Sequence, residues 1–237
     1  MRNLMNILDQ APVKRPIWRG DITSLAGKAY KAIEEKIVML ELAPGEIYTE
    51  KDLATLIGLG RTPIRDALLR LEHEQLVKVI SRQGIMILPL DFERDLLALD
   101  LRAVVERIVV ERATRLASPV DRKRLARMAD EMEKAAEDKD VLAFTRLDGA
   151  FHDFVADCAQ QPFAAKTLEP LHSLSRRAGT ILFRQDFERE IVEASRTHYV
   201  LMRAIADGDP ARANAAFDDL IERARRVTLE LAESQGF

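Results

Sequence analysis

The stretch GRTPIRDALLRLE (residues 60–72) places two arginines four residues apart at the start of a predicted helix. Cations are disfavoured there, because the amino end of a helix already carries partial positive charge and unpaired N–H donors. The arrangement becomes favourable if that end faces a polyanion, since the arginines and the free N–H groups then bind the same phosphates. Apolar residues at helical spacing mark the packed face: Ile64, Ala67, Leu68 and Leu71. Arg61, Thr62 and Arg65 are therefore predicted to point outward.

Two further helices are predicted before this stretch. SLAGKAYKAIEEKIVML (residues 24–40) repeats its apolar residues at helical intervals and ends at the turn APGE. In YTEKDLATLIG (residues 48–58), Thr49 is a predicted N-cap, Asp52 completes a variant of the capping box, and Gly58 closes the helix after about two turns. Only two residues separate this second helix from the third, so the turn between them is tight.

A β-hairpin is predicted after the third helix. LVKVISRQGIMILPL (residues 76–90) consists of two short β-rich runs around SRQG, with Gly84 near the bend. Helix, helix, tight turn, helix and hairpin together indicate a winged helix-turn-helix domain over residues 21–90. Residues 1–20 contain two prolines and no sustained period, so we expect a flexible arm there.

The chain changes character after residue 90. From residue 91 to 237 the pattern is helical, with breaks at ASPVD, AQQPF and DGDPAR that divide it into about six helices. Each helix has an apolar stripe, which predicts a second, all-helical bundle domain. The fold class expected for the whole chain is mainly α.

Composition narrows the classes of function. No run of about 18 apolar residues occurs and the first 20 residues lack the features of a signal peptide, so we expect a cytoplasmic protein without membrane contact. The net charge is −3, but residues 1–90 carry 13 Lys and Arg against 11 Asp and Glu, and the remainder 23 against 28. The first domain is thus the better partner for a polyanion.

The single Cys158 lies in an apolar pattern and is predicted to be a core residue.

The outward residues of the third helix suit a DNA-reading surface. Arg61 and Arg65 offer bidentate donors, and Thr62 a hydroxyl, in the first turn of a recognition helix. Lys51 on the second helix and Arg82 near the hairpin bend extend the basic surface on either side. Each charge alone is more simply explained as solvating an exposed face; together they predict contact with double-stranded DNA.

Polar residues interrupt the apolar stripes of the helical domain at three places. Asp148 and His152 lie four residues apart on one helix face and could share a metal ion. His198 lies within an apolar stripe and is predicted to point inward, where a hydrogen-bonded core histidine is the commoner outcome. Arg102 and Glu106 form either a solvated ion pair or part of a pocket.

The segment from residue 24 to 90 resembles the DNA-binding domain of the GntR family of bacterial transcription regulators. The resemblance rests on APGE, DLATLIG, GRTPIRDAL and SRQG, and it implies DNA contacts at the residues above and at Gly84 of the wing. Gly60 departs from the Ser or Thr usual in the family and removes a side-chain cap. Gln75 departs from the usual Gly at a helix end that often becomes left-handed, at a cost of roughly 1 kcal/mol.

Residues 92–232 resemble the FCD ligand-binding domain of the FadR-type subgroup, in which an Asp and three His surround a metal. Asp148, His152 and His198 match three of these positions, and Leu220 occupies the fourth. The resemblance implies a Zn²⁺, Ni²⁺ or Mn²⁺ site completed by water or an effector carboxylate, and a metal-free pocket is equally consistent. His172 is a further candidate for the missing ligand.

Arg102 matches an arginine that the family places in its effector pocket, which implies a small organic acid as the ligand. The expected function is therefore transcriptional regulation, most simply repression, by a homodimer whose DNA binding depends on such an acid. Two alternatives remain at this point: a metal-dependent hydrolase that uses Asp148, His152 and His198, and an architectural DNA-binding protein without a ligand.

Overall fold

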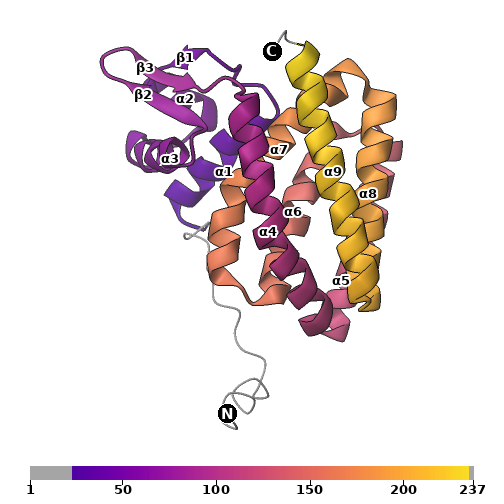
Figure 1. The fold of residues 1–237 in the computed structure, drawn as a ribbon. Coiled ribbons are helices and arrows are strands. Elements are labelled where there is room, and N and C mark those ends of the chain that lie inside the picture. Colours follow the sequence, from indigo (N-terminus) through magenta and orange to yellow (C-terminus); the bar gives the residue numbers. More distant parts are fainter. Residues whose placement is uncertain (1–22, 235–237) are drawn as a thin grey trace.

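The computed structural model describes residues 23–234, and the predicted arm at residues 1–20 lies outside the described residues (Figure 1). The first domain contains α1 (Leu25–Val38), β1 (Ile47–Tyr48), α2 (Glu50–Ile57), α3 (Arg61–His73), β2 (Val77–Ile80) and β3 (Gly84–Ile87). The second contains α4 (Phe92–Leu116), α5 (Pro119–Glu137), α6 (Val141–Ala159), α7 (Pro162–Gln185), α8 (Phe187–Asp207) and α9 (Pro210–Ser234). The predicted fold class and the six helices of the second domain are confirmed.

The helices of the first domain begin where their capping residues predict. Ser24 caps α1 by accepting from the backbone N–H of Gly27, and Thr49 and Asp52 form the reciprocal capping box of α2. Gly58 ends α2 with φ 73°, a left-handed conformation that favours glycine. The three helices enclose a small core of fully buried side chains: Ile33, Leu53, Ile64, Leu71 and Ile87.

Gly60 and Gln75, which differ from the residues usual in the GntR family, have the predicted effects at the two ends of α3. Gly60 is the N-cap and provides no side-chain hydrogen bond, so the first turn of α3 keeps its backbone donors available. After the helix, Gln75 has φ 57°, in the left-handed region that a non-glycine residue enters only at some cost. The recognition helix therefore starts with an uncapped end that can face an anion.

The sheet has one strand more than the sequence predicted. β2 and β3 form the predicted antiparallel hairpin, and β1 adds to the free edge of β3, so the strand order is β1-β3-β2. Gly84 has φ 135°, and a Cβ atom there would lie 2.5 Å from the backbone oxygen of Tyr48. Only glycine fits this close approach, which joins the hairpin to the chain entering α2.

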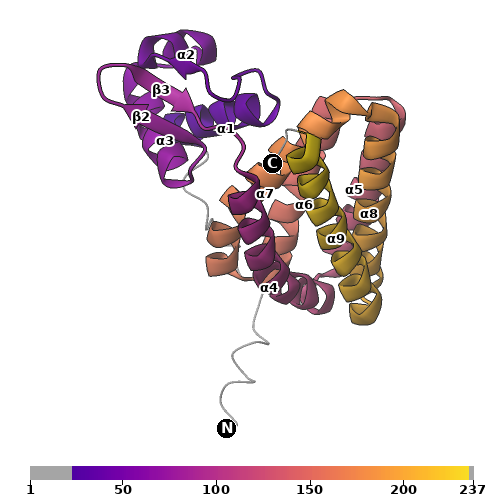
Figure 2. The ribbon, with the colours of Figure 1, turned by 45° about the horizontal axis from the view of Figure 1, so that its top comes forward.

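The six longer helices form the bundle, and one of them, α7, lies beside α1 of the first domain (Figures 1 and 2). The bundle core consists of interdigitated aliphatic and aromatic side chains, and Cys158 is buried in it as predicted. Within the described part of the chain, no helix is long and apolar enough to cross a membrane.

α4 exposes apolar side chains and buries charged ones. Leu101, Val104 and Ile108 are 46%, 66% and 51% exposed, whereas Arg102 and Glu106 are 2% and 3% exposed. The solvated reading of the Arg102–Glu106 pair is thus wrong. α4 therefore presents an aliphatic stripe to solvent on the face opposite its buried ion pair.

Candidate functional site

The five predicted DNA-contacting side chains all lie on the surface of the first domain. Their side chains are exposed on α2, on the first turns of α3 and in the bend between β2 and β3: Lys51, Arg61, Thr62, Arg65 and Arg82. Gly84 follows this bend and shapes the wing through its backbone. The arrangement combines an uncapped helix end with a cationic surface, which suits a phosphate backbone.

Arg65 already binds a carboxylate in the absence of DNA. Its Nε and Nη2 atoms donate to the two carboxylate oxygens of Glu50 at 3.2 and 3.1 Å, so α2 holds the guanidinium of α3 from the side. Both side chains are solvent-accessible, and exposed pairs of this kind contribute little to stability. A phosphate or a guanine edge would therefore replace Glu50 as the partner of Arg65 at a small cost in free energy. Until then, Glu50 fixes the orientation of the Arg65 guanidinium.

The second site is a small cavity of about 70 Å³ inside the bundle. α4, α6, α7, α8 and α9 all contribute to its walls. The lining includes most of the polar residues that the sequence singled out in this domain: Arg102, Asp148, His152, His172 and His198.

Asp148, His152 and His198 converge from α6 and α8. The Oδ1 atom of Asp148 lies 2.6 Å from Nε2 of His198 and 3.5 Å from Nε2 of His152. One donor atom from each residue lies within 4.8 Å of the others, and all three side chains are buried. Leu220 lines the same cavity from α9 and offers no donor atom. The fold thus brings together the three predicted ligands and the apolar fourth position.

The outer nitrogen of each histidine in this group is held by an acceptor. Nδ1 of His198 donates to the backbone oxygen of Ala194 at 2.7 Å, and Nδ1 of His152 donates to Oε1 of Glu106 at 2.6 Å. In both rings Nε2 is then the nitrogen that faces Asp148. Acceptors placed behind imidazoles in this way fix the tautomer that a metal requires.

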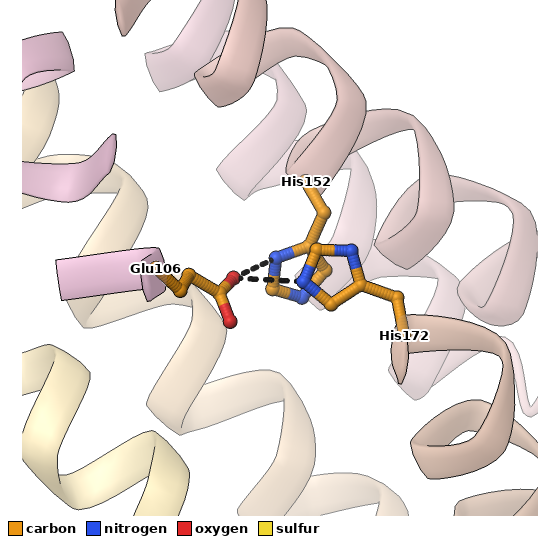
Figure 3. Close-up of side chains that lie close together, drawn as sticks. All are labelled: Glu106, His152 and His172. Atoms are coloured by element: carbon orange, nitrogen blue, oxygen red, sulfur yellow. Dashed lines mark hydrogen bonds and ion pairs between the residues drawn. The ribbon is translucent and has the colours of Figure 1, made fainter. Parts of the chain in front are cut away.

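Glu106 is the centre of a second buried cluster (Figure 3). Its Oε1 atom also accepts from Nε2 of His172 at 3.1 Å, and its Oε2 atom accepts from Nε of Arg102 at 3.1 Å. The rings of His152 and His172 are stacked with 4.0 Å between centroids. His172 therefore lies behind His152 and directs Nε2 at Glu106 instead of the gap beside Leu220.

The charges of the two clusters balance. Burial would raise the pKa of both carboxyls, but both pKa values are held well below their usual range: that of Glu106 mainly by Arg102, and that of Asp148 by His198 and His152. Burial would lower the pKa of His152, yet the two carboxylates raise it to about 9. Burial and the positive charge of His152 lower the pKa of His172 to about 3. One imidazolium thus lies between two carboxylates, and a metal ion would replace its proton.

Sequence reasoning missed three residues at this site. Glu106 was seen only as a neighbour of Arg102, although its spacing places it on the same helix face. Arg223 also lines the cavity, three residues after Leu220 on α9, and its Nε has no acceptor among the described residues. Arg176 lines it from α7, and no local pattern marks that residue, because its carboxylate partner Glu34 is 142 residues away in the sequence.

Both domains match known protein families. Residues 97–223 match the FCD domain, and residues 25–87 match the bacterial regulatory proteins of the gntR family. These two ranges coincide with the helical bundle and the winged helix-turn-helix.

Individual relatives agree with these matches. The chain is 28% identical over 211 residues to an HTH-type transcriptional regulator of Streptomyces ambofaciens, which covers 85% of this chain and 87% of that protein. It is 24% identical over 206 residues to the HTH-type transcriptional repressor RspR of Escherichia coli, covering 86% of each. The solved structure of E. coli McbR/YncC is similar with a TM-score of 0.78, covering 88% of this chain and 98% of that one at 19% identity, which shows the shared fold.

Proposed function

The chain belongs to the GntR family of bacterial regulatory proteins with an FCD domain, and from this premise we propose that it is a repressor controlled by a small carboxylate. It is a DNA-binding transcriptional regulator and not an enzyme, because its relatives are regulators, and the hydrolase alternative is therefore discarded. Repression is the part of the proposal that the name of RspR supports. The effector, the metal and the direction of control are the parts that experiments must test.

Recognition of DNA is assigned to the first turns of α3. Arg61 and Arg65 would read base edges in the major groove, and Thr62 and the free N–H groups of the uncapped helix end would bind phosphate. Lys51 and Arg82 would contact the backbone on either side, with the Gly84 wing beside the minor groove. The cationic surface around an uncapped helix supports this assignment.

A divalent cation is proposed at Asp148, His152 and His198. The donor set of one carboxylate oxygen and two imidazole nitrogens suits Zn²⁺, Ni²⁺ or Mn²⁺, and both rings present the same nitrogen because Glu106 and Ala194 hold the other. A bound cation would supply positive charge and an open coordination position beside Leu220. Water or an effector carboxylate would fill that position, and affinity for the cation would be lower than with a fourth histidine.

The single observation that carries the sensing role is a polar cavity inside an otherwise apolar bundle. Arg102 lines this cavity with each of its three guanidinium nitrogens partnered, since Nε and one terminal nitrogen pair with Glu106 and the other donates to Ser175 at 2.8 Å. The second hydrogens of its two terminal nitrogens would bind the effector. Such a buried, oriented cation beside a metal position would select a small carboxylate.

The test of the proposal requires the operator and a panel of carboxylates. An operator selected from random duplexes would be titrated with the purified protein, with and without Zn²⁺ and sodium salts of small mono-, di- and hydroxycarboxylic acids. We expect at least one acid to bind, to raise the thermal midpoint and to weaken operator binding. Operator binding that no member of the panel changes would contradict the proposed control and favour an architectural DNA-binding protein.

A further inference from the structure

We propose that an anionic ligand in the cavity binds Arg176 in competition with Glu34 of α1. Arg176 would then hold the effector and also connect the cavity with the winged helix-turn-helix domain (the reading domain). The inference deepens the proposed carboxylate sensing and rests on it. It concerns a residue of α7, the bundle helix that packs on α1 of the reading domain (Figure 2).

Glu34 is a carboxylate of the reading domain that is buried against the bundle. Its side chain is 3% exposed, and its Oε1 atom accepts from Nη2 of Arg176 and, at 2.6 Å, from the hydroxyl of Ser173. Both partners belong to α7, so one oxygen atom of α1 holds two side chains of the other domain. A buried carboxylate tolerates the loss of its cationic partner poorly.

The same guanidinium also lines the cavity. Nε of Arg176 is buried and has no hydrogen-bond acceptor among the described residues, and it lies 4.0 Å from Oδ2 of Asp148. This separation is too long for a hydrogen bond, so the N–H lacks a partner beside the proposed metal ligand. Arg176 lines the cavity together with Arg102, which approaches from α4.

The packing of α6 permits the guanidinium to lie across this position. A Cβ atom at Gly149 would be 2.8 Å from Nη1 of Arg176, so the absence of a side chain at Gly149 leaves space for the arginine. The guanidinium thus extends from the cavity past α6 to α1. It is the geometry of a cation shared between two anionic positions, one occupied by Glu34 and one open to a ligand.

A carboxylate in the cavity would satisfy the unpartnered Nε and draw the guanidinium towards itself. Glu34 would then lose part of the positive charge that neutralises it. This loss favours hydration of the Glu34 carboxylate and displacement of α1 from α7. Because α1 packs directly on α3, a displacement of α1 would carry the recognition helix with it. Ligand binding and the seating of the reading domain would be coupled through competition for one cation.

Three single variants test this assignment. Arg176→Gln removes the proposed ligand contact and should weaken binding of the best acid of the panel by about 10- to 100-fold, as loss of a charge-assisted hydrogen bond implies. Glu34→Gln removes the competitor and should strengthen binding of the same acid by about 3- to 10-fold. It should also shift operator affinity of the ligand-free protein towards that of the ligand-saturated wild type. A residue with only a structural role would not give opposite signs in the two variants.

Arg146→Gln is the matched control. Arg146 of α6 pairs with Glu35 of α1 at 2.7 Å through both nitrogens, so it also joins the bundle to the reading domain, but it does not line the cavity. The affinity of the Arg146→Gln variant for the best acid of the panel should remain within about 2-fold of wild type. The double variant Glu34→Gln, Arg176→Gln keeps an uncharged pair and replaces Arg176→Gln if that variant does not fold; it too should bind the acid weakly.

Isothermal titration calorimetry with the acid, and fluorescence anisotropy with the operator, provide both readouts. If wild type binds an acid and Arg176→Gln or its double variant binds it equally well, Arg176 is not a ligand contact and the inference is overturned while carboxylate sensing stands. An unchanged acid affinity in Glu34→Gln overturns the competition. If wild type binds no acid of the panel, carboxylate sensing itself fails and the inference fails with it.

Discussion

Arg65 is a predicted DNA contact whose guanidinium is already held by a neighbouring residue. Glu50 binds it in a bidentate geometry, which a phosphate or a guanine would also satisfy. Arg61 has a different environment, because it is exposed at the helix start, where cations are disfavoured. Arg61 is tolerated there because its side chain is exposed to water, and Arg65 because Glu50 supplies the opposite charge.

Arg61→Ala and Arg65→Ala should each weaken binding to the selected operator by about 5- to 150-fold, since each is expected to lose one base-reading contact. Neither side chain packs in the core, so the thermal midpoint should remain close to wild type. Anisotropy titrations at one fixed salt concentration measure the effect. Arg127→Ala on the exposed face of α5 is the control, and operator binding as tight as wild type in either α3 variant would refute the recognition-helix assignment.

Lys51→Ala should act differently, because a phosphate contact carries no sequence information. Binding to operator and to random duplex should weaken by the same factor, and the slope of log affinity against log salt should decrease by roughly one unit. A changed base preference with an unaltered slope would place Lys51 against a base instead of the backbone.

Glu106 determines which nitrogen of His152 is free. Glu106→Gln places a weaker acceptor behind the imidazole and should lower Zn²⁺ affinity by about 10- to 100-fold, measured by competition with a chromophoric chelator. Glu131→Gln, on the exposed surface of α5, is the control for the loss of one negative charge. Wild type that binds Zn²⁺ no better than Glu106→Gln would show that the histidine needs no such support.

At the scale of elements, periodicity predicted the helices well and their faces less well. Caps at Thr49 and Gly58 located α2, and the helical spacing of the apolar residues from Ile64 to Leu71 located α3, because these signals are local. β1 was missed because two residues carry no period. The sequence did not show whether Arg102 and Glu106 are buried. A stripe of aliphatic residues on α4 can lie in the core of the bundle or on its surface. Only the tertiary structure distinguishes these two.

The first turn of α4 contains a carboxyl group with an unfavourable environment. Asp95 is 5% exposed, neither of its carboxylate oxygens has a hydrogen-bond partner among the described residues, and burial raises its pKa to about 6 although Arg177 and Arg94 oppose the shift. Because the folded pKa lies above the unfolded value, the ionised group destabilises the fold above pH 6 and ceases to do so below about pH 4.

Replacement of Asp95 should therefore change the pH dependence of stability. As the pH rises from about 4 to 7, the unfolding free energy of Asp95→Asn should increase relative to wild type by about 2 to 3 kcal/mol. Urea unfolding at several pH values and one protein concentration measures this difference. A difference that does not vary with pH would mean that the carboxyl titrates normally.

At the scale of the molecule, sequence reasoning recognised both domains and six residues that line the cavity, but not how the domains meet. Glu34 and Arg176 lie 142 residues apart, and neither interrupts a pattern in a way that marks it. The same holds for Arg70 of α3, which donates to Glu169 of α7 at 2.6 Å. Contacts of this kind depend on the relative placement of the domains, which no short stretch of sequence contains.

The exposed stripe of α4 supports a homodimer. Leu97, Leu101, Val104 and Ile108 follow spacings of four, three and four residues and are 46% to 66% exposed, as on a helix that pairs with a second helix. A two-fold axis through two copies of α4 would cover both stripes at once. Two reading domains would then face the two halves of a palindromic operator.

Val104→Arg should convert the dimer to monomer, because it introduces a charge at the most exposed position of the stripe. Light scattering coupled to size-exclusion chromatography measures the mass, and operator affinity should decrease together with it. Val120→Arg on α5, which is 75% exposed but lies off the stripe, is the control. A Val104→Arg protein that remains dimeric would place the interface elsewhere.

If the α4 stripe pairs two chains, its separation from the α3 surface predicts a genetic consequence. A chain with a damaged recognition helix but an intact α4 would still pair with wild-type chains in the same cell, and each mixed pair would hold only one working reading domain. Alleles that alter Arg61 or Arg65 should therefore be dominant over wild type. Alleles that place a charge at Val104 should be recessive, because their products never enter a mixed pair.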